Sequence, residues 1–217
     1  MRVRLASIQY GSTLNSLLIS STAPGDGKTV VSSNIAITYA RHGAKTLLID
    51  FDLRRPKLRH VFTEIGDVKN LAEVLLDESV GASEFEALAQ QSDCKNLDVI
   101  ATHAVDDDVS AAEIVGSDNA RRLLNWAKEN YDQVILDSPP HGHISDAGVL
   151  ASQVSGVVLV CWADRSRKHS LRHAVQQLSE VGANIVGVAI NSVRQDATSG
   201  FGRYDYYHRE YDSTRYV

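Results

Sequence analysis

The chain has 217 residues, a length that suits one large α/β domain better than two small ones. Hydrophobic residues make up 43% and charged residues 23%, which are ordinary proportions for a soluble globular protein. The formal net charge of −5 argues against broad electrostatic binding of nucleic acid, so no nucleic-acid partner is expected.

Neither a disulfide framework nor a membrane segment is predicted. Cys94 and Cys161 lie far apart and in no metal-ligand spacing, which predicts reduced, partly buried thiols and no zinc site. The start of the chain, Met1–Leu5, lacks the apolar core of a signal peptide, and the strongest apolar run, 156–163, is too short to cross a bilayer. We therefore expect a soluble, cytoplasmic chain, which could still lie beside a membrane through a partner.

Apolar runs of strand length alternate with segments of helical period. Strands are predicted at 17–20, 46–52, 97–101, 133–137, 156–162 and 184–191. Helices are predicted at 28–42, 71–76, 83–90, 110–130, 146–152 and 170–181, and Gly43 and Gly182 occupy left-handed positions at two helix ends. The alternation predicts a doubly wound, mostly parallel sheet flanked by helices, with ligands bound at the carboxyl ends of the strands.

The composition changes once, near the end of the chain. From about Arg194 apolar periodicity stops, and few aliphatic residues with many charges predict a flexible tail. The prediction is one domain over residues 1–195 and a tail over residues 196–217. The tail contains five of the eight tyrosines: Tyr204, Tyr206, Tyr207, Tyr211 and Tyr216.

The first motif with chemical meaning is T-A-P-G-D-G-K-T at 22–29, between the first strand and the first helix. It matches a phosphate-binding loop, G-x-x-x-x-G-K-[ST], except that Thr22 replaces the first glycine. Glycines let backbone N–H groups face an anion, and the helix start adds its positive dipole end. The alternative is a surface turn before a helix that binds no ligand. The predicted nucleotide contacts are Pro24, Gly25, Asp26, Gly27, Lys28, Thr29 and Val30.

Two acidic motifs follow strands. Asp50 and Asp52 leave the second strand at i and i+2, and strand geometry places both on one side, where they can face one site. Asp137 ends the strand of V-I-L-D-S-P-P, as does the second Mg²⁺ element of phosphate-loop NTPases. Acids in polar turns are the alternative for each motif alone. Their order behind a phosphate loop favours a nucleotide–Mg²⁺ site.

Together the three motifs resemble the bacterial tyrosine kinases (BY-kinases) of polysaccharide export. The resemblance covers nearly the whole chain, because the segments at 70–76, 112–115 and 121–124 are also similar to the family pattern. It implies a P-loop NTPase-like fold, ATP and Mg²⁺ as cofactors, and protein-tyrosine kinase activity.

The resemblance also implies residue roles. Lys28 would stabilise the transferring phosphoryl group, and Thr29, Asp52 and Asp137 would hold Mg²⁺. Asp50 would accept the hydroxyl proton of the incoming tyrosine, mainly by orienting it, because a tyrosine pKa is near 10.

Asn191, at the end of the last strand, is an adenine contact by the same resemblance, with capping of the strand end as an equal alternative.

For the tail, the resemblance implies autophosphorylation in trans within a homo-oligomeric ring. Each phosphate adds about −1.5 to −2 charge, which would repel tails from the acidic site and loosen the ring. It further implies a membrane polysaccharide co-polymerase domain or activator segment as a partner, at the inner face of the cell membrane. An aromatic tail that packs on a partner is the alternative.

The chain departs from the family pattern in three places. The E-x-x-R-x-x-R element for oligomer contacts is missing before the first strand, where only Arg2 and Arg4 occur, as if the chain began inside that helix. The basic run 54–59 could bind phosphotyrosine or form a solvated loop. His141 and His143 replace apolar residues and are interpreted as polar lining rather than metal ligands.

Two other functions remain open. Partitioning and septum-site ATPase switches share these motifs, but they carry a second lysine five residues before the main one, and that position is Ala23 here. A catalytically silent nucleotide-binding regulator is the other alternative, against which the intact Lys28, Asp50, Asp52 and Asp137 argue.

Overall fold

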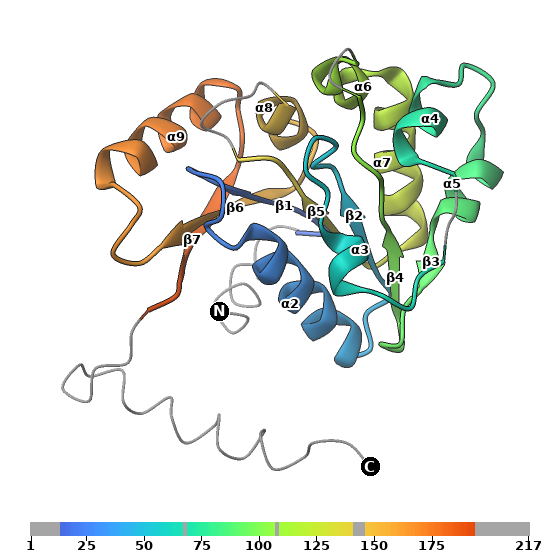
Figure 1. Ribbon diagram of the computed structural model, residues 1–217, viewed down its shortest axis with the longest axis horizontal. Coiled ribbons are helices and arrows are strands. Elements are labelled where there is room, and N and C mark those ends of the chain that lie inside the picture. The colour runs from blue at the N-terminus through green and yellow to red at the C-terminus, as the bar shows by residue number, and fades with distance from the viewer. Residues whose placement is uncertain (1–13, 67–68, 107–108, 141–145, 194–217) are drawn as a thin grey trace, which may run out of the picture.

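A seven-stranded sheet forms the centre of the computed structural model, which describes residues 14–66, 69–106, 109–140 and 146–193 (Figure 1). The strand order is β3-β4-β2-β5-β1-β6-β7, and only β3 runs antiparallel to its neighbour. The predicted mostly parallel, doubly wound sheet is thereby confirmed. The strands are β1 (Ser16–Ser21), β2 (Thr46–Asp50), β3 (Gln90–Gln91), β4 (Leu97–Ile100), β5 (Gln133–Asp137), β6 (Gly156–Trp162) and β7 (Ile185–Asn191).

Helices cover both faces of the sheet. The helices are α2 (Lys28–Arg41), α3 (Leu58–Val61), α4 (Leu71–Leu76), α5 (Ala82–Leu88), α6 (Ala111–Gly116), α7 (Asp118–Asn130), α8 (Asp146–Ala151) and α9 (Lys168–Glu180). Apolar residues of α2 and α3 pack on one face, and those of α4 to α9 pack on the other (Figure 1). No helix within the described ranges has both the length and the apolar character needed to span a bilayer.

The central strands read as continuous apolar runs because both of their faces are buried. Every residue of β1, β2 and β5 is buried. The register pairs Ile19 of β1 with Asp137 of β5, and Asp137 with Asp50 of β2. The three predicted motifs therefore leave the sheet side by side at its carboxyl edge, where ligands bind in open α/β folds.

Two predicted elements differ from the structure. The helix expected over 110–130 is two helices, because Ser117 is extended and its hydroxyl caps α7 by accepting from the N–H of Ala120. The strand expected over 46–52 ends at Asp50, so Phe51 and Asp52 lie beyond it. The short elements β3 and α3 carry too little periodicity to be predicted. The left-handed helix ends at Gly43 and Gly182 are confirmed.

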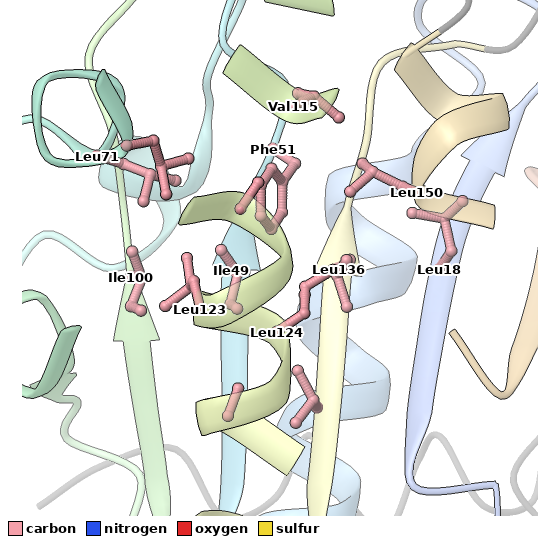
Figure 2. Close-up of a cluster of buried hydrophobic side chains, with 14 of the residues drawn as sticks. Leu18, Ile49, Phe51, Leu71, Ile100, Val115, Leu123, Leu124, Leu136 and Leu150 are labelled. Atoms are coloured by element: carbon pink, nitrogen blue, oxygen red, sulfur yellow. The ribbon is translucent and has the colours of Figure 1, made fainter. Parts of the chain in front are cut away.

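Phe51 anchors the segment between the two acids of the second motif. Its side chain is 1% exposed and belongs to the same buried cluster as Ile49, Val115 and Leu123 (Figure 2). Leu53 is buried in this cluster too, so apolar side chains at 51 and 53 alternate with acids at 50 and 52. Because neighbouring side chains of extended backbone point to opposite sides, Asp50 and Asp52 lie on the side opposite to this cluster.

We predict that Phe51→Ala lowers the free energy of unfolding by about 3–5 kcal/mol, because it removes a fully buried aromatic ring and leaves a cavity. Leu76→Ala is the control, since Leu76 is 58% exposed and its truncation should cost less than about 0.5 kcal/mol. Urea unfolding of both variants measures the difference. Equal losses would contradict the assigned role of Phe51.

Candidate active site

A cavity of about 700 Å³ opens at the carboxyl edge of the sheet, a size that accommodates a small ligand. It is bordered by the phosphate loop, by the segment after β2, and by the ends of β5, β6 and β7. Its lining residues are Pro24, Gly25, Gly27, Lys28, Thr29, Val30, Asp52, Arg54, Arg55, Lys57, Pro139, Pro140, Trp162, Asn191 and Ser192.

Glycines give the phosphate loop its shape. Gly25 and Gly27 have φ of +78° and +91°, a left-handed conformation that other residues adopt only with strain. A Cβ atom on Gly27 would lie 2.0 Å from the side-chain nitrogen of Asn191, so no larger residue fits there. Gly27 is also the N-cap of α2, and the helix therefore begins beside the cavity with its positive dipole end.

Asp26 fixes the loop from inside. Its carboxylate is fully buried and accepts hydrogen bonds from the N–H of Ala23 at 3.1 Å and from the Thr22 hydroxyl at 3.3 Å. On its other oxygen it accepts from Arg165 at 3.2 Å and from the Ser166 hydroxyl at 3.4 Å. The loop is thus held in shape before any ligand arrives, which lowers the cost of binding.

Lys28 is a buried cation that faces the cavity. Its side chain is 7% exposed, and no carboxylate of the described residues forms an ion pair with it. Burial lowers its pKa, while the charges of Asp137, Asp52 and Asp26 act to raise it. A buried ammonium group without a direct partner is costly, and an anion in the cavity would relieve that cost.

Asp50 holds the segment that follows β2. It is fully buried, and one oxygen accepts from the N–H of Asp52 at 3.1 Å. The other accepts from the N–H groups of Lys57 and Leu58 at 2.9 and 3.0 Å. Burial raises the pKa of Asp50 to about 6, against the effect of these three bonds. The carboxylate does not line the cavity.

Asp52 and Asp137 both interact electrostatically with Lys28. Asp52 is half-buried and lines the cavity, and burial raises its pKa while Lys28 lowers it. Asp137 is 1% exposed, and burial together with the charge of Asp50 raises its pKa to about 8. A hydrogen bond from Thr29 and the charge of Lys28 oppose that rise.

These residues fit a Mg²⁺ ion bound together with a nucleotide. One oxygen of Asp137 is buried and has no hydrogen-bond partner, so a ligand or cation at that point would satisfy it. Within the described part of the chain no cluster of three His, Cys, Asp or Glu could cage a metal. Mg²⁺ usually takes only one or two carboxylates plus phosphate oxygens and water, and Asp52, Asp137 and Thr29 provide that set.

Comparison with known proteins relates the sequence of this chain to tyrosine-protein kinases. A family profile described as an AAA domain matches residues 16–184. The tyrosine-protein kinase YwqD of Bacillus subtilis is 31% identical over 88% of this chain and 78% of its own length. The chain belongs to the bacterial tyrosine-protein kinase family.

Solved structures agree with that membership. The kinase domain of the Escherichia coli tyrosine kinase ETK superposes with a TM-score of 0.82 at 31% identity, covering 92% of this chain and 75% of that one. The septum-site protein MinD of Pyrococcus horikoshii, solved with Mg-ADP, gives a TM-score of 0.65 at 22% identity, over 80% of this chain and 68% of that one, which shows a shared fold alone. The kinase relationship is therefore favoured over the ATPase-switch alternative.

Most residues that line the cavity belong to motifs predicted from the sequence. All predicted nucleotide contacts line it except Asp26, whose buried carboxylate holds the loop. Asp52 lines it as well, whereas the buried Asp50 and Asp137 do not. The five tail tyrosines and the histidines at 141 and 143 lie outside the described residues. The basic run predicted as a possible phosphotyrosine contact borders the cavity through Arg54, Arg55 and Lys57. The residues missed from the sequence are Pro139, Pro140, Trp162, Arg165 and Ser192.

One signal could have found Trp162, because it ends a predicted parallel strand at the edge where ligands bind.

The pKa shifts predict how the metal-free protein responds to pH. The folded-state pKa of Asp137 lies above its ordinary value of 3.8, so the folded state binds a proton more tightly than the unfolded state does. The stability that this group contributes is complete below about pH 4 and is lost as the pH rises toward 8. The raised pKa of Asp50 acts in the same direction.

We therefore expect Asp137→Asn, in the presence of a chelator, to have a free energy of unfolding about 2 kcal/mol higher than that of the parent protein at pH 7.5. The stability of the variant should also depend less on pH. Asp93→Asn, at an exposed carboxyl, is the control and should change the free energy of unfolding at pH 7.5 by less than about 0.5 kcal/mol. Thermal unfolding between pH 5 and 8 tests this. A variant less stable than the parent across the whole range would contradict it.

Proposed function

We propose that the chain is an ATP-dependent protein-tyrosine autokinase. It transfers the γ-phosphoryl group of ATP to tyrosines of its own segment 196–217, and in this way regulates exopolysaccharide or capsule synthesis and export. The chain is a member of the tyrosine kinase family, and one feature of its cavity supports the proposal. Lys28, Thr29 and Asp52 line the same cavity, and the buried Asp137 has an oxygen without a hydrogen-bond partner.

The reaction needs placement and charge stabilisation more than covalent chemistry. The bond between the γ-phosphorus and its bridging oxygen breaks as a tyrosine oxygen bonds to phosphorus, and ADP leaves. The loop N–H groups and the start of α2 hold the phosphates, and Lys28 neutralises the charge that develops on the transferring group. A Mg²⁺ ion bound by Thr29, Asp52 and Asp137 would supply further charge neutralisation.

The acceptor hydroxyl loses its proton as the new bond forms, and two aspartate carboxylates are candidates for orienting the hydroxyl and accepting that proton. Asp50 was predicted for this role from the sequence. Its three backbone hydrogen bonds and complete burial favour a positioning role instead, because contact with a tyrosine would require breaking them. Asp52 lines the cavity, and its backbone N–H donates to the carboxylate of Asp50. We assign the orienting role to Asp52.

The proposal includes partners. The tail of one subunit would enter the cavity of a neighbour within a homo-oligomeric ring, and a membrane polysaccharide co-polymerase domain or activator segment would bind the ring. These assignments rest on family membership, and they would place the chain on the inner face of the cell membrane.

An ATPase switch of the septum-site type is less well supported. Its likeness to this chain is one of fold, and the second lysine of such switches is replaced here by Ala23. The N–H of Ala23 instead bonds the buried Asp26 as part of the loop scaffold. A silent regulator is disfavoured because Lys28, Thr29, Asp52 and Asp137 are all present and converge.

Purified protein incubated with labelled ATP and Mg²⁺ tests the proposal, with phosphotyrosine and free phosphate measured together. We expect phosphotyrosine, and we expect replacement of the five tail tyrosines by Phe to abolish most of it. Tyr39→Phe is the matched control and should label normally, since Tyr39 lies on α2 and outside the tail. Free phosphate without phosphotyrosine would support the switch, and neither product, even with an added activator segment, would support the regulator.

A second prediction separates the two aspartates of the second motif. Asp50→Asn should lower the free energy of unfolding by about 1–3 kcal/mol. The side-chain NH2 group of asparagine cannot accept the hydrogen bonds that the backbone N–H groups of the protein donate to Asp50. Asp52→Asn should change stability by less than about 1 kcal/mol and lower kcat at least about 10-fold. Urea unfolding and steady-state kinetics give both values. A stable Asp50→Asn protein with an altered pH–rate profile would return the orienting role to Asp50.

A further inference from the structure

One end of the cavity is not explained by phosphate chemistry. Lys28, Thr29 and the loop glycines line the phosphate end, whereas Trp162 and the ring of Pro140 give another part of the wall an apolar character. Trp162 is the last residue of β6 and is half-buried. Its indole ring belongs to neither of the two buried apolar clusters of the described residues, so it does not serve the hydrophobic core.

A network of contacts holds the indole in place. The guanidinium of Arg165 lies 4.9 Å from the centre of the Trp162 ring. The same guanidinium bonds Asp26 at 3.2 Å and the carbonyl of Pro24 at 3.2 Å. The turn is closed by the Ser166 hydroxyl, which accepts from the N–H of Trp162 at 2.8 Å. The indole is therefore fixed relative to the phosphate loop.

This arrangement leaves part of the ring for a ligand. Arg165 covers the ring but does not line the cavity, whereas Trp162 does. Trp162 therefore borders the cavity while Arg165 packs on its ring, which leaves part of the indole available to a ligand. A flat apolar surface at a fixed distance from a phosphate loop suits the base of a nucleotide whose phosphates occupy that loop.

Asn191, the residue that the sequence suggested for the base, is already engaged. Its side-chain nitrogen donates to the carbonyl of Asp26 at 3.0 Å, and its side-chain oxygen accepts from the N–H of Ser192 at 2.9 Å. It also fills the space beside Gly27. These contacts favour Asn191 as a support of the phosphate loop rather than as the group that reads the base.

We propose that Trp162 is the base-stacking residue of the nucleotide site. The inference rests on the proposed function only in requiring that the cavity bind a nucleotide. Stacking requires a π-face and no particular hydrogen-bond pattern, so the contribution of Trp162 should be similar for adenine and guanine nucleotides and absent for a ligand without a base.

Calorimetric titration of the full chain with Mg-ADP, Mg-GDP and inorganic tripolyphosphate tests the proposal. We expect Trp162→Ala to weaken ADP and GDP about 10-fold each and to leave tripolyphosphate within about twofold. Trp162→Phe keeps a smaller aromatic face and should weaken ADP by less than about threefold. Thermal unfolding of each variant checks that the fold is retained.

Tripolyphosphate distinguishes stacking from a structural role. If Trp162 served only to hold Arg165 and through it the phosphate loop, Trp162→Ala would weaken tripolyphosphate as much as ADP. Equal losses for the two ligands would therefore overturn the proposal. Unchanged ADP affinity would overturn it as well.

A fluorescence experiment avoids any change at Trp162. The chain has two tryptophans, and the other, Trp126, packs against Phe85 and Tyr131 with ring centroids 6.1 and 5.9 Å away. In a Trp126→Phe protein, saturating ADP should change the emission of the remaining indole. In Trp162→Phe, ADP should leave the emission of Trp126 unchanged. The reverse pattern would overturn the proposal even if Trp162→Ala failed to fold.

The two hypotheses fail separately. ADP binding that depends on Trp162 in a protein that makes no phosphotyrosine would reject the kinase function and keep the stacking residue. Phosphotyrosine formation with ADP affinity independent of Trp162 would do the opposite. Absence of ADP binding by the parent protein would overturn both.

Discussion

Burial of charge at one edge of the sheet is the constraint on which the site depends. Lys28, Asp50 and Asp137 are each less than 10% exposed, and all three lie where β1, β2 and β5 end. Charged groups in a low-dielectric environment interact strongly and are costly unless they are paired. An anionic ligand and a divalent cation at this edge would relieve that cost.

The remaining structure keeps that edge rigid. Phe51 and Leu53 are packed into one core, which fixes the direction of the acids beside them. Asp50 bonds three backbone N–H groups, and Asp26 is held by four donors, so both loops beside the cavity are shaped by buried carboxylates. Preorganisation of this kind reduces the reorganisation needed when charge is transferred.

The β6–α9 turn joins the phosphate end of the cavity to its apolar end. Arg165 contacts both the Trp162 ring and the Asp26 carboxylate, so this turn connects the indole to the loop at 22–29. In the proposed function such a link would keep base and phosphates at a constant distance, which favours productive placement of the γ-phosphoryl group.

The sequence alone determined the alternation of strands and helices, the three motifs and the family, because these depend on local periodicity and on short patterns whose chemistry is fixed. For the same reason it singled out Lys28 and Thr29, and both line the cavity. The tertiary structure decided what depends on distant segments: that Asp50 is closed off by the backbone at 57 and 58, that Asn191 supports the phosphate loop from 165 residues away, and that Trp162 faces the cavity. Such roles arise from packing between strands, which no local pattern encodes.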